Sequence, residues 1–127
     1  MIDKIGAIIL DSKRMLVART RGLDTFFIPG GKRKQGENDM QALEREIVEE
    51  LGAKTVNPKY YNTFFAKSHD DADEVRVIAY FVELDRVPKA SSEIEEILWI
   101  DKHNYDNYKL GNILKIMIPE MIKEDIL

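Results

Sequence analysis

The chain of 127 residues contains no cysteine, so neither disulfide bonds nor thiolate metal sites are available to it. It has no run of about eighteen apolar residues, the length that a membrane-spanning helix needs. Its N-terminus lacks the pattern of a secretory signal peptide. No internal repeat, low-complexity tract or linker divides the sequence. These absences favour a single domain over residues 1–127, located in the cytoplasm and not attached to a membrane.

An excess of positive charge is also absent, since the formal net charge is -4 at pH 7. Proteins that bind nucleic acids regardless of sequence use Lys and Arg to neutralise phosphates. The balance therefore argues against broad nucleic-acid binding, although it allows one small nucleotide bound through a metal ion. The apolar content of 44% and the charged content of 33% are ordinary for a globular domain that buries a core.

One helix is specified more completely than any other element, between Asn38 and Gly52. Asn38 suits an N-cap, and Gln41 stands three residues later, as in a capping box. Gly52 can end the helix in a left-handed conformation. The apolar residues at helical spacing, which predict the buried stripe, are Met40, Leu43, Ile47 and Leu51.

Three glutamates share one face of this helix. Glu46, Glu49 and Glu50 are spaced i, i+3 and i+4, so their carboxylates are close neighbours that repel one another. Mg²⁺, a hard cation that takes oxygen ligands, would offset this repulsion. Arg45 can also pair with Glu49 at i,i+4. Taken alone, such a pattern is more typical of a solvated helix face.

The wider pattern favours the metal site. Residues 30–53 read GGKRKQGENDMQALEREIVEELGA, with five residues between Gly31 and Glu37 and seven more before Arg45. Glu46 follows Arg45, and an apolar residue, the glutamate pair and Gly52 complete the pattern. At every fixed position the segment resembles the Nudix box of the Nudix hydrolase family, and the short chain is similar to the MutT-like branch. Ala53 is the weakest match, because a larger aliphatic residue is more usual there.

The resemblance implies the Nudix fold, an α/β/α sandwich with a mixed β-sheet and the box as a loop–helix–loop beside it. The order of elements agrees, since strands precede and follow the glutamate helix and a helix ends the chain. We expect strands at 5–10 and 15–18 (a hairpin), 26–28, 55–66 (with a break), 74–84 (central and buried) and 97–100. The terminal helix, 111–118, either bends at Pro119 or is followed by a second helix beginning there. Its buried side comprises Leu114, Met117, Met121 and Ile122.

The resemblance also implies roles for the residues of the box. Glu46, Glu49 and Glu50 would bind Mg²⁺, or Mn²⁺ as a substitute, and the backbone carbonyl of Gly30 or Gly31 would join them. Either Glu46 or Glu50 would serve as the general base.

Two further roles lie outside the metal ligands of the box. Glu37 and Arg45 would form an ion pair that braces the loop against the helix. Family members often add a glutamate from the loop before a later strand. Glu93 is the best candidate, with Glu95 and Glu96 as rivals.

Candidate substrate residues lie elsewhere in the chain. Arg19 and Arg21 suit phosphate binding, although for at least one of them a solvated charge at the strand end is the favoured explanation. Phe27 is expected to line a cleft, since adjacent aromatic residues on a strand point to opposite faces. Asn112 matches the position at which MutT-like members read a purine, and it is also a suitable helix N-cap. Lys32, Arg33 and Lys34 could hold polyphosphate, and His69 is expected to be a loop residue and not a catalyst.

Three functions remain open at this point. The first is hydrolysis of a nucleoside triphosphate, including oxidised purine nucleotides, to the monophosphate and pyrophosphate. The second is hydrolysis of ADP-ribose, a nucleoside diphosphate, a nucleotide sugar or the 5′ end of RNA. The third is a nucleotide sensor without turnover, which the intact set of glutamates disfavours. A homodimer is compatible with the resemblance, since dimers are common in the family.

Overall fold

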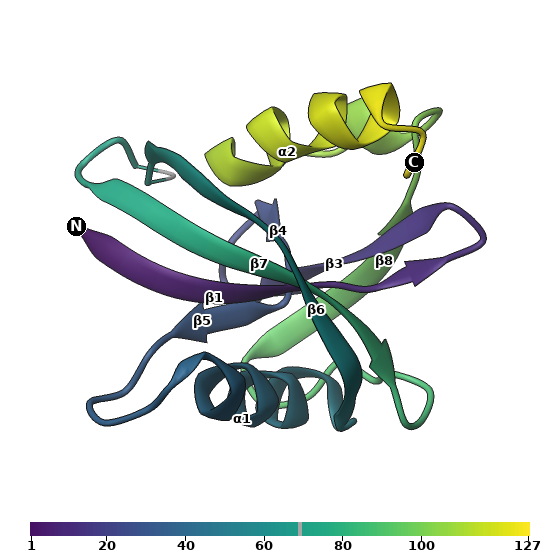
Figure 1. The fold of residues 1–127 in the computed structure, drawn as a ribbon. Coiled ribbons are helices and arrows are strands. Elements are labelled where there is room, and N and C mark those ends of the chain that lie inside the picture. The colour runs from purple at the N-terminus through teal and green to yellow at the C-terminus, as the bar shows by residue number, and fades with distance from the viewer. Residues whose placement is uncertain (69) are drawn as a thin grey trace.

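The computed structural model describes residues 1–68 and 70–127 of the chain. His69, expected in a polar loop, lies outside the described residues. A layer of strands is covered on one side by helix α1 (Asp39–Leu51) and on the other by helix α2 (Asn112–Lys123), as Figure 1 shows. The strands are β1 (Ile2–Ile8), β2 (Leu10–Asp11), β3 (Arg14–Thr20), β4 (Phe26–Phe27), β5 (Gly30–Lys32), β6 (Thr55–Lys67), β7 (Glu74–Leu84) and β8 (Ile94–Ile100). A 3₁₀ turn, η1 (Tyr105–Asn107), precedes α2. The predicted α/β/α sandwich is confirmed.

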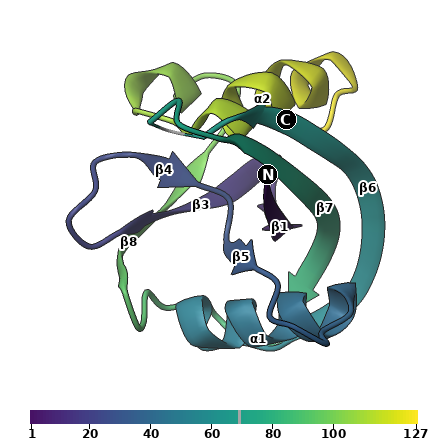
Figure 2. The same cartoon turned by 90° about the vertical axis from the view of Figure 1, so that its left-hand side faces the viewer.

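The strands form two four-stranded sheets. The first has the order β5-β1-β7-β6, and it is mixed because β1 and β7 run parallel while the other pairs are antiparallel. The second contains β2, β3, β4 and β8, with β8 paired to β3. The predicted central position of segment 74–84 is confirmed, because β7 lies between β1 and β6. Figure 2 shows β3, β4 and β8 on the opposite side of the molecule from β6 and β7.

The hairpin predicted near the N-terminus is shorter than expected. Its turn is correct, since Ser12 and Lys13 have φ values of 52° and 61° and join β2 to β3. The segment before it belongs mostly to β1, which pairs with β7 and β5 instead of β3. The chain passes between the sheets at Ile9, whose carbonyl accepts a 3.0 Å hydrogen bond from the amide of Leu16. The division of this segment between two strands is set by pairing with distant strands, which the local sequence pattern does not show.

Helix α1 begins and ends where the sequence predicts. The Asn38 side chain accepts from the amide of Gln41 at 2.9 Å, and the Gln41 side chain accepts from the amide of Asn38 at 2.9 Å. Gly52 ends the helix with φ 64°. Met40, predicted to belong to the buried stripe, is 37% exposed instead, and the first buried residues of the helix are Ala42 and Leu43. The residues of α1 that pack on the first sheet are Ala42, Leu43, Ile47 and Leu51.

The remaining elements differ from the predictions in detail. Segment 55–67 is one strand, with the expected break reduced to register shifts around Pro58, which cannot donate a ladder hydrogen bond. Helix α2 continues through Pro119 as one helix, so no second helix begins there. Its buried side contains Leu114, Met117 and Met121 as predicted, with Ile118 besides, whereas Ile122 is only partly buried. Among the described residues, neither helix has the length and apolar character required to cross a bilayer.

Candidate active site

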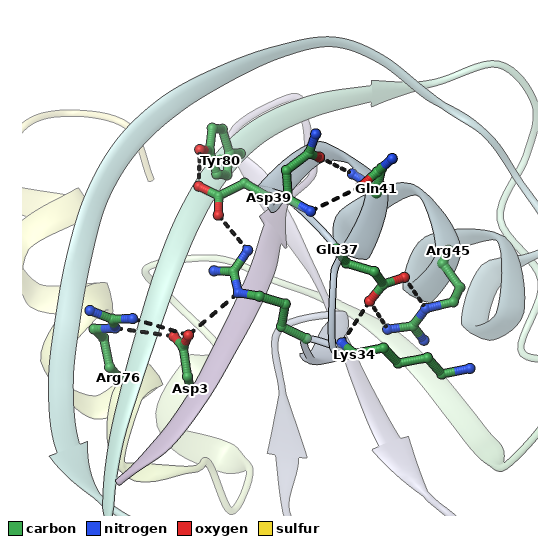
Figure 3. Close-up of polar contacts among 10 residues, drawn as sticks. Asp3, Lys34, Glu37, Asp39, Gln41, Arg45, Arg76 and Tyr80 are labelled. Carbon is green, nitrogen blue, oxygen red and sulfur yellow. Dashed lines mark hydrogen bonds and ion pairs between the residues drawn. The ribbon is translucent and has the colours of Figure 1, made fainter.

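The loop between β5 and α1 is fixed to the helix by Glu37 and Arg45. The guanidinium of Arg45 donates two hydrogen bonds to the Glu37 carboxylate, at 2.7 and 2.9 Å, and a third to the carbonyl of Lys32 at 3.1 Å. The amide of Lys34 donates to the same carboxylate at 2.7 Å (Figure 3). The hydrogen bonds from Arg45 and from this amide lower the pKa of Glu37 to about 2. The pair predicted from the sequence is therefore formed.

A second network ties the start of α1 to the first sheet. Arg33 contacts Asp39 at 2.6 Å and Asp3 at 3.4 Å, and Asp3 also pairs with Arg76 at 3.0 Å. The hydroxyl of Tyr80 donates to Asp39 at 2.6 Å (Figure 3). Of the basic cluster, Arg33 is thus committed to the scaffold, which argues against a role for it in holding polyphosphate.

The three glutamates of α1 have different surroundings. Glu49 is the most exposed, with 47% of its side chain accessible, and Glu46 retains only 12%. The guanidinium of Arg45 lies 2.9 Å from Glu46 and 3.6 Å from Glu49. Arg45 therefore supplies the positive charge among the repelling carboxylates, and it reaches two of the three.

Glu50 is the glutamate that Arg45 does not contact. Only 7% of it is exposed, and its Oε1 accepts a 3.0 Å hydrogen bond from the amide of Gly30. Burial raises the pKa of Glu50 to about 8, and the nearby charges of Glu46 and Glu93 add to the effect, while the amide of Gly30 and the charge of Lys4 oppose it. Glu50 is consequently a buried carboxyl group in a site that is short of positive charge.

The two glycines of β5 allow this close approach. Gly30 has φ 142°, and a Cβ there would lie 2.1 Å from the carbonyl oxygen of Ile5. A Cβ on Gly31 would lie 2.6 Å from the carboxyl carbon of Glu46. The absence of side chains thus lets β5 pass directly against the glutamate face of α1. Participation of either glycine carbonyl in a metal site remains a prediction.

The role of Glu93 as the additional glutamate remains a prediction. Its charge contributes to the raised pKa of Glu50. Glu95 is paired with Arg21 at 3.4 Å, and Glu96 with Arg19 at 3.2 Å. Both rivals are therefore occupied by arginines.

A cleft of about 390 Å³ begins at Glu50 and extends toward the N-terminal end of α2. It is lined by strands of both sheets and by both helices, and its surface is largely apolar. The candidates Phe27, Gly31, Glu50 and Asn112 all line it. Four residues predicted for the site thus lie around one cleft.

Arg19 and Arg21 do not belong to the cleft that the described residues form. Besides its contact with Glu96, Arg19 donates to the carbonyl of Leu23 at 2.9 Å. The reason is the register of β3 and β8, which places Arg19 directly opposite Glu96. Their prediction as phosphate ligands is not supported by these positions.

Asn112 is not the N-cap of α2, because Gly111 occupies that position. Its amide nitrogen instead donates to the carbonyls of Lys67 and Ser68, each at 3.1 Å. Asn112 therefore joins the start of α2 to the end of β6 at the rim of the cleft.

Sequence reasoning missed Lys4, which lines the cleft from β1. Burial and the neighbouring charge of Lys32 lower its pKa, against the opposing charges of Glu50 and Glu46. The available signal was a lysine immediately before an apolar run, at the spacing of the core-facing positions.

The donor set fits a hard divalent cation, because carboxylate oxygens are the ligands such ions prefer and Glu50 forms no close ion pair with a described residue. As they lie, however, no three acidic or imidazole groups of the described residues converge closely enough to hold one. Glu46 and Glu49 point toward Arg45 instead. Binding an ion would require these two side chains to turn from Arg45 toward Glu50.

The fold is an α/β/α sandwich with a carboxylate-bearing helix beside a largely apolar cleft. Residues 2–121 match the model of the NUDIX domain. The chain therefore belongs to the Nudix hydrolase family.

Individual relatives agree with this assignment. The chain is 30% identical over 116 residues to Nudix hydrolase 6 of Arabidopsis thaliana, an alignment that covers 81% of this chain and 40% of that protein. It thus spans less than half the length of that relative. The ORF135 protein of E. coli is 25% identical, with a TM-score of 0.77 and coverage of 98% of this chain and 89% of that one.

A further solved structure is similar in fold alone. It is a mutator MutT protein from Bacillus halodurans, with 19% identity and a TM-score of 0.76, covering 94% of this chain and 80% of that one.

Proposed function

We propose that the protein hydrolyses a nucleoside diphosphate linked to a group X, with Mg²⁺ as cofactor. The favoured substrate is a nucleoside triphosphate, including an oxidised purine nucleotide, cleaved to the monophosphate and pyrophosphate. The observation that carries this proposal is the buried, electrostatically unbalanced Glu50 at a cleft large enough for a nucleotide. The cytoplasm, where nucleotides are abundant, is the compartment we expect.

Each residue of the site would contribute a separate part of the chemistry. A bound divalent ion neutralises phosphate charge and lowers the pKa of a coordinated water. Glu46, Glu49 and Glu50 would hold it, with Glu93 as the additional acid. Glu46 or Glu50 would accept the proton from the attacking water, and a group with a pKa near the working pH is suited to this step. Glu37 and Arg45 would hold the loop in place without contacting the substrate.

The remainder of the cleft suits the nucleoside portion of the proposed substrate. Its apolar walls, which include Phe27, suit a planar base, and its polar rim at Asn112 supplies hydrogen-bonding groups. Among the solved structures with this fold is a UDP-X diphosphatase, 16% identical, with a TM-score of 0.77, covering 98% of this chain and 63% of that one. At such identity it supports the fold alone.

A panel of substrates would test the proposal. Release of phosphate, pyrophosphate and nucleoside monophosphate should be measured with canonical and oxidised nucleoside triphosphates, ADP-ribose, nucleoside diphosphates, nucleotide sugars and 5′-triphosphorylated RNA, with Mg²⁺ and with EDTA. Metal-dependent turnover of a triphosphate, with pyrophosphate as product, would support the favoured substrate. Turnover of a different compound only would identify that compound as the substrate of the same hydrolytic reaction. Tight binding without turnover of any member would identify a nucleotide sensor and overturn the proposal.

A further inference from the structure

Lys4 occupies a position where the strand pattern calls for an apolar residue. Successive residues of a strand point to opposite faces, so Lys4 shares its face of β1 with Ile2, Gly6 and Ile8. Ile2, Lys4 and Gly6 all line the cleft. Lys4 is therefore the only charged side chain on this face of β1 in the described structure.

A second lysine stands beside it. Lys4 pairs in register with Lys32 across the antiparallel β1–β5 ladder, and both side chains line the cleft. Like charges placed directly opposite each other on adjacent strands destabilise a sheet. Repulsion between the two lysines therefore costs the fold stability at the cleft.

No carboxylate of the described residues offsets this cost by direct contact. Neither lysine ammonium group lies within 4.0 Å of an acidic oxygen. Elsewhere in the described residues, fourteen ion pairs join a lysine, an arginine or the N-terminal amine to a carboxylate. The Nζ of Lys4 lies 5.7 Å from the centre of the Phe27 ring, which also lines the cleft. Two adjacent ammonium groups without a close counter-ion are suited to an anion bearing several oxygens.

We infer that Lys4 binds a non-bridging phosphate oxygen of the substrate, with Lys32 beside it, in the same cleft as Glu50 of α1. The inference rests on the proposed function, since the diphosphate of the substrate is the anion. In this arrangement the glutamates act on one part of the phosphate chain while the lysine pair fixes another. Such fixing places the scissile bond, as charge-assisted hydrogen bonds do at other phosphate sites.

The competing explanation is that Lys4 serves only as a distant counter-charge for Glu50 and Glu46. The two explanations differ in their consequences for each ligand. A phosphate-binding lysine contributes to diphosphate affinity, whereas a counter-charge competes with the metal ion and leaves diphosphate affinity unchanged.

Calorimetric titration of the whole chain can separate these explanations. Inorganic pyrophosphate would be titrated with Mg²⁺ and again with EDTA, and Mg²⁺ would be titrated alone. The variants are Lys4→Met, which keeps the apolar stem, Lys4→Gln and the charge-conserving Lys4→Arg. The matched control is Lys59→Met, an exposed lysine of β6 outside the cleft of the described residues.

We expect Lys4→Met and Lys4→Gln to weaken pyrophosphate binding about tenfold or more, with Mg²⁺ affinity unreduced. Lys4→Arg should stay within about threefold of the parent, as should Lys59→Met. Melting curves would verify folding, and Lys4→Met provides the folded variant if Lys4→Gln does not fold.

Unchanged pyrophosphate affinity in the folded Lys4 variants would overturn the inference, as would an equal loss in Lys59→Met. Failure of the parent protein to bind pyrophosphate would also overturn it. Absence of turnover across the substrate panel, with Lys4-dependent pyrophosphate binding intact, would instead count against the proposed reaction alone.

Discussion

Glu50 is the residue whose burial makes the stability of the fold depend on pH. Its pKa of about 8 when folded stands against an ordinary value of 4.5, so the folded state binds a proton that the unfolded state releases between these values. In the absence of metal, stability should therefore fall as the pH rises from about 4.5 to about 8, and level off above that. The loss is a few kcal/mol at most, since one pKa unit corresponds to about 1.4 kcal/mol.

Urea denaturation in EDTA at several pH values would measure this effect. Glu50→Gln, which keeps an oxygen to accept from the amide of Gly30, should remove most of the decline. The lowered pKa of Glu37 makes stability rise with pH, but only below pH 4.5. Above that value its contribution to stability is constant, so it does not mask the effect of Glu50. Parallel curves for the two proteins between pH 5 and 8 would show that Glu50 is not buried as described.

The glutamates can also be tested by turnover. Glu49→Gln and Glu50→Gln should each reduce Mg²⁺-dependent hydrolysis at least about a hundredfold while circular dichroism remains unchanged, because an amide is a poorer ligand for a hard cation. Glu120→Gln, an exposed change on α2, is the control and should retain activity. Full activity in either box variant would remove that residue from the metal site.

Among the elements, the loop before α1 depends on the ion pair between Glu37 and Arg45. Glu37→Gln should lower the melting temperature by several degrees, since it weakens two hydrogen bonds from Arg45 and one from the amide of Lys34. Activity should fall less than in the Glu50 variant. Scanning calorimetry and kinetics on the same samples give both values, and an unchanged melting temperature would exclude the bracing role.

Substitutions in strand β5 test a further prediction, because a side chain added at each of its two glycines would meet different neighbours. Gly30→Ala places a methyl group against backbone and should destabilise the fold strongly. Gly31→Ala meets only the mobile end of Glu46, so it should displace that carboxylate and weaken Mg²⁺ binding with little change in melting temperature. Equal loss of stability in the two variants would contradict this distinction, and calorimetry with and without Mg²⁺ would decide it.

For the whole molecule, the cleft joins surfaces that come from both sheets and both helices. A bound nucleotide should therefore slow hydrogen exchange in segments that are far apart in sequence. We expect protection by α,β-methylene-ATP with Mg²⁺ in β1, in β4 and at the start of α2, with none in the outer half of β6 at 55–60. Protection confined to the loop at 32–37 would place the ligand outside the cleft.

The features of this molecule that the sequence predicts are those set by residues close together in the chain. The caps of α1, its glutamate face and the partnership of Glu37 with Arg45 all follow from separations of a few residues to eight. The division into two sheets and the occupation of Arg19 by Glu96 depend on strand pairing between distant segments. Lys4 escaped notice because its face of β1 becomes a cleft wall only when β4 and α2 are in place.

Arg45 has a consequence for the binding of the proposed ion. Because its guanidinium already contacts Glu46 and Glu49, two carboxylates of α1 are partly neutralised without any metal. If the proposed Mg²⁺ binds there, it would displace the guanidinium from these carboxylates, so loading would be an exchange of one cation for another.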